Sequence, residues 1–348
     1  ESLGELSAFI GAQTSAEAVN DILARLSAEG YAANTLSAFT SGRSFATSVL
    51  DCGARKPMVS SDDGSCAWFE IEGSLLDQQA DGFLDVETNS TRIAGGAEVN
   101  LNDTLSLGVA GAWESTALAA GDRFLSDEER VLLGVGLEQQ TGALSLGASV
   151  SGSYGTFDST RVVGIDGEII PGTPVTLGTG RADHRVGQVT LRGTARFEAT
   201  HATLPLYAAP GVDLDATYLI GFDQNEDGLG AAGLDLQRTD QVVAAATPSL
   251  ELGFRVENES VAMHGFMRAG LALFSTDEIT QDAALIGAPE SAGSFRASTP
   301  LDKVGATLDA GFIVEDASRG LGLRFGYSGS FSEVSETHAV SVGLQFKF

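Results

Sequence analysis

The C-terminal stretch, residues 337–348, limits the possible folds of this chain more than any other feature. Its residues alternate strictly, with mostly large apolar side chains on one face and small or polar side chains on the other. One face carries His338, Val340, Val342, Leu344, Phe346 and Phe348, and the other carries Ala339, Ser341, Gly343, Gln345 and Lys347. A transmembrane β-strand needs roughly 9–11 residues tilted across the bilayer. The pattern therefore predicts a closing strand whose outer face contacts lipid and whose inner face contacts water.

The same period of two recurs along the chain from residue 67 onward. It predicts about twelve spanning strands, and even strand numbers are typical of bacterial outer-membrane barrels. The polar faces carry Arg, Glu, Asp, Ser and Gly, whereas a soluble β-sandwich, the alternative, would have shorter strands with the apolar face inside. We therefore expect an all-β membrane protein, a roughly twelve-stranded antiparallel outer-membrane β-barrel over residues 67–348.

The connections between the expected strands alternate between short and long. Outer-membrane barrels show the same alternation, with short turns on the periplasmic side and longer loops on the extracellular side. Short connections fall near residues 100–103, 140–142, 200–203, 257–260 and 315–320, and long ones near 77–87, 115–121, 158–180, 221–233 and 276–292. This order predicts that the first strand runs outward and that the C-terminus is periplasmic.

Composition excludes two further classes. No run approaches the roughly 18 consecutive apolar residues of a transmembrane helix. The formal net charge of −27 argues against nucleic acid as a partner, because nucleic-acid binding needs a basic face. We expect acidic loops that face solvent instead. The chain begins at Glu1 without a signal peptide, so we expect the mature or trimmed form of an exported protein.

Residues 27–51 are predicted to form a slim and mostly polar helix. Its main large side chains are Tyr31, Leu36, Phe39, Arg43 and Phe45, which leave a thin apolar stripe for a surface helix, the alternative. A barrel of more than about eight strands leaves a lumen that such a helix could fill. The candidates for ion pairs between this N-terminal segment and the lumen are Arg25, Arg43 and Arg55 with Glu70, Glu72, Glu98, Asp213 and Asp215.

The chain has two cysteines, Cys52 and Cys66, which lie between the expected helix and the first strand. A closely spaced pair fits an oxidising compartment such as the periplasm. A disulfide across this loop of about fifteen residues would contribute roughly 3 kcal/mol in the chain-entropy model. Two unpaired thiols are the alternative. The pairing predicts a disulfide-closed connector over residues 52–66.

One segment resembles a metal site. Asp223, Asn225 and Asp227 match the start of a calcium loop, D-x-N-x-D-G, but Leu234 occupies the position that requires a bidentate Glu. A solvated acidic loop is the alternative. The histidines show no metal-ligand spacing, and Ser–His–Asp combinations prove nothing without geometry. We predict no catalytic residue, no enzyme activity and no cofactor.

Several motifs in a fixed order resemble the translocator domain of bacterial autotransporters, the type V secretion family. The resemblance covers nearly everything from Leu26 onward. It depends on Leu26-Ser27-Ala28-Glu29-Gly30-Tyr31-Ala32-Ala33, Phe45, Cys52 and Cys66 before Trp68, Gly73-Ser74-Leu75-Leu76-Asp77-Gln78-Gln79-Ala80-Asp81-Gly82, Val212-Asp213-Leu214-Asp215-Ala216-Thr217-Tyr218 and Phe348. The resemblance implies a twelve-stranded barrel with an N-terminal helix plugging the pore, and transport of an upstream passenger.

The resemblance also implies partners. The barrel-assembly machinery would recognise the C-terminal strand, with Val342, Leu344, Phe346 and Phe348 as the signal. Outer-membrane lipid, lipopolysaccharide, periplasmic chaperones and a surface passenger or other surface protein complete the expected set, and no nucleotide is consumed. Some members cut their passenger free at paired asparagines, but here Asn20 precedes Asp21 and Asn34 precedes Thr35. We therefore carry over no catalytic residue.

The sequence predicts an outer-membrane translocator domain that carries or anchors a passenger at the cell surface. Residues 1–26 would be a passenger remnant or linker with a short helix, residues 27–51 the plug helix, and the N-terminus would lie at or toward the surface. The alternatives are a porin-like passive channel gated by its N-terminal segment and a structural outer-membrane anchor.

Overall fold

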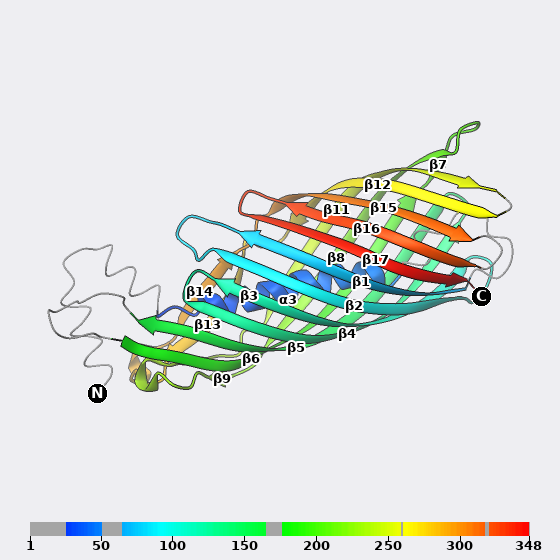
Figure 1. Ribbon diagram of the computed structural model, residues 1–348. Coiled ribbons are helices and arrows are strands. Elements are labelled where there is room, and N and C mark those ends of the chain that lie inside the picture. The colour runs from blue at the N-terminus through cyan, green and yellow to red at the C-terminus, as the bar shows by residue number, and fades with distance from the viewer. Residues whose placement is uncertain (1–25, 51–64, 165–175, 259, 317–319, 348) are drawn as a thin grey trace.

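The protein is a closed β-barrel of 12 antiparallel strands with a helix inside it, as the computed structural model shows (Figure 1). The structure describes residues 26–50, 65–164, 176–258, 260–316 and 320–347. The expected fold class is confirmed. The barrel strands are β1 (Cys66–Gln78), β2 (Val86–Asn100), β3 (Leu105–Ala120), β4 (Phe124–Thr141), β5 (Leu144–Gly164), β6 (Thr176–Phe197), β8 (Leu206–Gly221), β11 (Gln241–Glu257), β12 (Val261–Phe274), β15 (Val304–Asp316), β16 (Leu321–Phe331) and β17 (Ser335–Lys347).

The last strand closes the barrel, as its alternation predicts. Strand β17 pairs antiparallel with both β16 and β1, in a register that places Val342 opposite Ile71. Val342 is 51% exposed on the outer face, whereas Gln345 is 7% exposed and points inward. Because lipid surrounds a membrane barrel, the apolar side chains are stable on the outside. Phe348, the last residue of the expected assembly signal, lies outside the described residues.

The two ends of the barrel differ. At the turn end, where β17 finishes, neighbouring strands are joined by short connections such as residues 101–104 and 142–143. At the opposite end, which we call the capped end, the connections over residues 222–240 and 275–303 are long. The prediction of a long connection at 115–121 is wrong, because β3 continues to Ala120 and the chain turns directly into β4. Small residues such as Ala117, Ala119 and Ala120 give little apolar contrast between the two faces there, so the strand is not evident from the sequence.

The long connections at the capped end form a second sheet that no pattern in the sequence predicts. This cap sheet has four strands in the order β14-β13-β10-β9. Its elements are β9 (Gln224–Asn225), the 3-10 helix η1 (Gly230–Ala232), β10 (Leu234–Leu236), β13 (Glu278–Leu285), η2 (Glu290–Ala292) and β14 (Phe295–Pro300). A further short strand, β7 (Ala199–Thr200), pairs with β8 at the turn end. The cap sheet therefore lies over the end of the barrel at which the helix begins (Figure 1).

The helix α3 (Glu29–Ser48) lies in the lumen, within the segment 27–51 that the sequence assigns to a plug (Figure 1). Its large side chains Tyr31, Phe39 and Phe45 are buried, and so are polar ones such as Asn34. No helix among the described residues is long and apolar enough to span a membrane.

Candidate functional site, the helix seat inside the barrel

Helix α3 packs close against one side of the lumen wall. It contacts β3, β4, β5, β6 and β8, and the cap strands β13 and β14. Small residues on this wall permit the approach. A Cβ added at Gly134 would lie 2.5 Å from Cγ2 of Val49, beyond the C-terminal end of α3. Glycine at this position therefore makes room for the helix end.

At the capped end, a buried carboxylate joins the helix to both the wall and the cap. The hydroxyl of Tyr31 donates to Oε1 of Glu226 at 3.0 Å, and Arg161 on β5 donates to both Glu226 oxygens at 2.9 and 2.5 Å. The backbone N–H of Leu234 also donates to Oε2 at 3.1 Å. Glu226 is 2% exposed. We call Tyr31, Glu226 and Arg161 the triple contact, because it joins α3, the barrel wall and a surface connection.

Apolar packing surrounds the triple contact. Tyr31 belongs to one buried cluster with Phe124 on β4 and with Leu234 and Leu236 on β10. The rings of Tyr31 and Phe124 meet edge to face with centroids 5.0 Å apart. Glu29, in the first turn of α3, accepts a hydrogen bond from the backbone N–H of Leu84. A carboxylate is favourable at a helix N-terminus because the backbone dipole is positive there.

The calcium-like segment is part of this contact, but it does not form a metal loop. Residues 223, 225 and 227 alternate along extended chain, since β9 pairs with β10 and Asp227 bridges to Arg181. Alternate side chains of an extended chain stand roughly 7 Å apart and do not converge. Asp223 accepts the N–H of Arg238 at 2.6 Å. Among the described residues, no group of three or more His, Cys, Asp or Glu is placed to hold a metal.

The middle of the helix is held by hydrogen bonds and one ion pair. Asn34 donates to Oγ of Ser159 at 2.9 Å. Arg43 donates to Asp215 at 3.2 Å and to Thr247 at 3.0 Å. Of the expected ion pairs, Arg43–Asp215 forms, whereas Arg25 and Arg55 lie outside the described residues. These contacts anchor a polar helix in a polar lumen.

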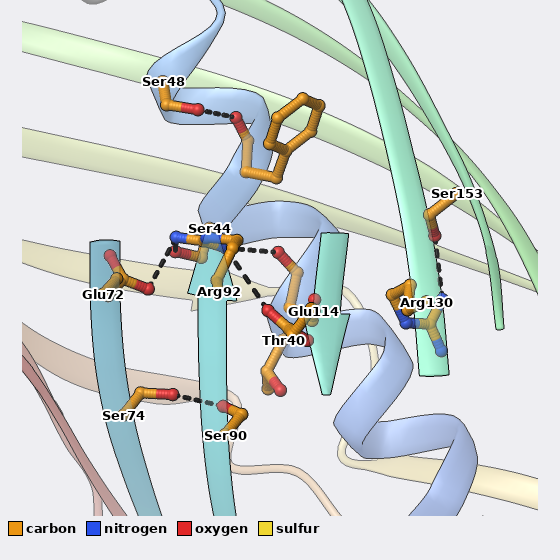
Figure 2. Close-up of polar contacts among 12 residues, drawn as sticks. Thr40, Ser44, Ser48, Glu72, Ser74, Ser90, Arg92, Glu114, Arg130 and Ser153 are labelled. Atoms are coloured by element: carbon orange, nitrogen blue, oxygen red, sulfur yellow. Dashed lines mark hydrogen bonds and ion pairs between the residues drawn. The ribbon is translucent and has the colours of Figure 1, made fainter. Parts of the chain in front are cut away.

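On the opposite face of the helix, Arg92 on β2 extends into the lumen (Figure 2). It donates to Oγ of Ser44 at 3.0 Å and to Glu72 on β1 at 2.6 Å, and its Nη1 lies 3.7 Å from Glu114 on β3. Arg92 is buried and has lost its hydration. Its two carboxylate neighbours compensate for that loss. The sequence does not identify Arg92, because one arginine on an alternating strand gives no signal of its own.

The apolar side chains farther along the helix are buried in two more clusters. Nearer the capped end, Leu36 and Phe39 pack with Leu219, Val243 and Ile279. Toward the turn end, Phe45 packs with Val49, Trp68 and Leu132. The five large side chains assigned to the plug helix, Tyr31, Leu36, Phe39, Arg43 and Phe45, therefore all lie in the lumen. Cys66 is buried at the start of β1. Cys52 lies outside the described residues, so the Cys52–Cys66 disulfide stays a prediction.

Comparison with known proteins agrees with this architecture. A family model described as "Autotransporter beta-domain" matches residues 67–329. The translocator domain of the autotransporter NalP from Neisseria meningitidis superposes with a TM-score of 0.69 at 13% identity, covering 92% of this chain and 100% of that one. The transport unit of AIDA-I from Escherichia coli gives a TM-score of 0.58 at 12% identity, covering 88% and 98%. At such identities the likeness concerns the fold.

A curated relative, an extracellular serine protease from Serratia marcescens, is 23% identical over 303 residues. The match covers 83% of this chain but 26% of the relative, so the chain spans about a quarter of that protein's length. The family match covers most of the barrel. The chain therefore belongs to the autotransporter beta-domain family, which implies an outer-membrane location.

Proposed function

We propose that this barrel carries or anchors an N-terminal passenger at the cell surface, and that α3 is the part of the connecting chain that stays in the lumen. The observation that carries the proposal is the direction of α3. Its N-terminal end lies among the cap strands, and its C-terminal end lies at the turn end near the start of β1. A chain that continues upstream from α3 therefore leaves the barrel at the capped end.

The proposed orientation places the capped end outside the cell and the turn end in the periplasm. Outer-membrane barrels have short periplasmic turns and longer extracellular loops. The cap sheet and the longest connections lie at one end, and the described chain finishes at the other. The C-terminus would then be periplasmic, where the outward side chains Val342, Leu344 and Phe346 are available to the assembly machinery.

The proposed role is transport without catalysis. The titratable side chains around α3 are used in structural contacts: Glu226 binds Tyr31 and Arg161, and Arg92 binds Glu72. His184 packs edge to face against the ring of Tyr31, with centroids 5.5 Å apart. Periplasmic chaperones and lipopolysaccharide are the remaining proposed partners, because both meet a barrel of this kind during its assembly.

An epitope fused to Glu1 tests the proposal. Antibody added to intact cells should bind it, as it should bind a control epitope placed between β1 and β2. A second control epitope between β11 and β12 should react only after the outer membrane is permeabilised. If the Glu1 epitope behaves like the second control, the N-terminus is periplasmic, and a channel closed by its N-terminal segment replaces the translocator.

A further inference from the structure

Two side chains of the barrel wall pack against α3 at its two glycines. Phe124 on β4 contacts the helix at Gly30, and a Cβ added at this glycine would overlap the aromatic ring. Gln188 on β6 contacts the helix at Gly42, where an added Cβ would overlap the side-chain amide. Every other residue of α3 carries a Cβ. The close approach of these two wall side chains therefore requires glycine on the helix.

Both wall side chains are held in place by neighbours. Phe124 is 2% exposed and meets the ring of Tyr31 edge to face. Gln188 is 3% exposed, and its amide donates to Oγ1 of Thr190 at 3.2 Å. Thr190 also shares a hydrogen bond of 3.0 Å with Thr217 on β8. Neither wall side chain can turn away from the helix without the loss of buried packing or of a buried hydrogen bond.

A third close contact has the glycines on the wall and the side chains on the helical segment. Val49 and Leu50 follow α3 directly in the chain. A Cβ added at Gly136 on β4 would lie 2.7 Å from Cδ2 of Leu50. Gly134 on the same strand leaves room for Val49 in the same way. The helix and the wall therefore fit each other at three successive levels of the lumen.

These contacts fix α3 both along its axis and around it. Gly30 and Gly42 are twelve residues apart, which is roughly 18 Å along an α-helix and about a third of a turn around it. A shift of one turn in either direction would bring Ala38 or Ala46 opposite Gln188. Either alanine would place a Cβ where the amide of Gln188 leaves no room. The wall therefore accepts α3 at one axial position.

We propose that the two glycines of α3 are the signal at which the connecting chain stops in the barrel, and that Gln188 and Phe124 are the positioning residues that recognise it. The inference rests on the proposed function, in which the chain upstream of α3 leaves through the lumen. The fit between wall and helix would then determine how much of the chain remains inside. The alternative is a tether, in which residues 51–64 stop the chain by their length alone.

Cross-linking in cells separates the two accounts. In a background without native cysteines, an insertion of about six Gly and Ser residues after Ser60 lengthens the tether by up to roughly 20 Å. N34C should still form a disulfide with S159C, because the native side chains are 2.9 Å apart and the glycines keep that position. A38C, one turn farther along α3, should not link to S159C. A link that passes from N34C to A38C on insertion would overturn the proposal in favour of the tether.

A second set of variants changes the fit itself. In the lengthened chain, G42L should lower the yield of the N34C–S159C link at least about fivefold, because overpacking disfavours the seated position. Q188A should restore the yield in the double variant, since it removes about as many side-chain atoms as leucine adds. T47L, on an exposed position of α3, is the matched control and should equal the unsubstituted chain.

The wall pair S126C–S159C reports in every variant whether the barrel has assembled. A failure of G42L to assemble that Q188A repairs would support the fit. An assembled G42L barrel with an undiminished helix–wall link would overturn the proposal, and so would a loss that Q188A does not repair. None of these links depends on the side of the membrane at which Glu1 lies, so the stop signal and the proposed function can fail separately.

Discussion

At the scale of single residues, the position of the plug depends most on Glu226. This carboxylate lies within a motif that resembles a calcium loop, yet the fold turns it inward between Tyr31 and Arg161. A buried arginine that loses its carboxylate is left as an uncompensated charge. The same segment also carries exposed acidic residues such as Asp227, so the two kinds of carboxylate can be compared directly.

Removal of the Glu226 carboxylate should loosen the capped end. We expect E226A to lower the free energy of unfolding by about 3–5 kcal/mol, the range for one partner lost from a buried ion pair. Y31F should cost less, about 1.5–3 kcal/mol, because it removes one hydrogen bond to a charged group. Urea unfolding in lipid vesicles measures both. D227A is the control, and an effect of D227A equal to that of E226A would contradict the triple contact.

Calcium should not stabilise the protein through Asp223, Asn225 and Asp227, because these side chains do not converge. Addition of calcium or of a chelator should leave the unfolding midpoint unchanged for both the wild type and D227A. A midpoint that rises with calcium in the wild type and not in D227A would show that the segment rearranges into a metal loop.

At the scale of elements, the barrel wall receives α3 through glycines, and the cap sheet then covers its N-terminal end. Alternation along the strands predicts the wall, since lipid on one face and water on the other impose a period of two. The cap sheet gives no such signal. Its strands are short and depend on distant partners, as when Leu234 pairs with Leu285 and packs against Tyr31. Local sequence cannot show such contacts.

A side chain at Gly134 should displace the end of α3. G134L places a Cβ 2.5 Å from Val49 Cγ2. Such overpacking typically lowers the free energy of unfolding by about 1–3 kcal/mol. G193L on β6 is the matched control, because a Cβ there has no atom within 4 Å. The two variants are compared by the temperature at which half of each protein has shifted from its folded to its unfolded gel mobility. Equal midpoints for G134L and G193L would contradict the close contact between this wall and the helix end.

The cap sheet should weaken slightly in acid. Two hydrogen bonds from Arg296, at 2.7 and 3.0 Å, lower the pKa of Asp282 below its usual value of 3.8. Because the pKa is depressed in the folded state, the stabilisation is present above the usual value and is lost as the pH falls through the folded pKa. The pair is largely exposed, so we expect no more than about 0.5 kcal/mol. Hydrogen exchange of β13 amides should differ between wild type and D282N at neutral pH and converge in strong acid. A difference that persists in acid would contradict this account.

At the scale of the whole molecule, the sequence is enough to predict the barrel, the helix inside it and the family. The alternating strands and the ordered motifs each report on a local pattern, and local patterns are visible in a sequence. The one-sided seat of α3 is not, because it depends on which wall approaches the helix. Arg92 and Glu226 acquire their roles only when strands and connections distant in the chain meet.

The presence of α3 in the lumen of the assembled protein is the central claim, and a cross-link in cells tests it most directly. In a C52S and C66S background, N34C with S159C should form a disulfide, because the native side chains are 2.9 Å apart across the helix–wall boundary. S126C with S159C, neighbours within the wall, is the positive control. N34C with L125C, whose native side chain faces outward from the barrel, should not link. A linked wall pair with an unlinked N34C and S159C would place the helix outside the lumen and contradict the account.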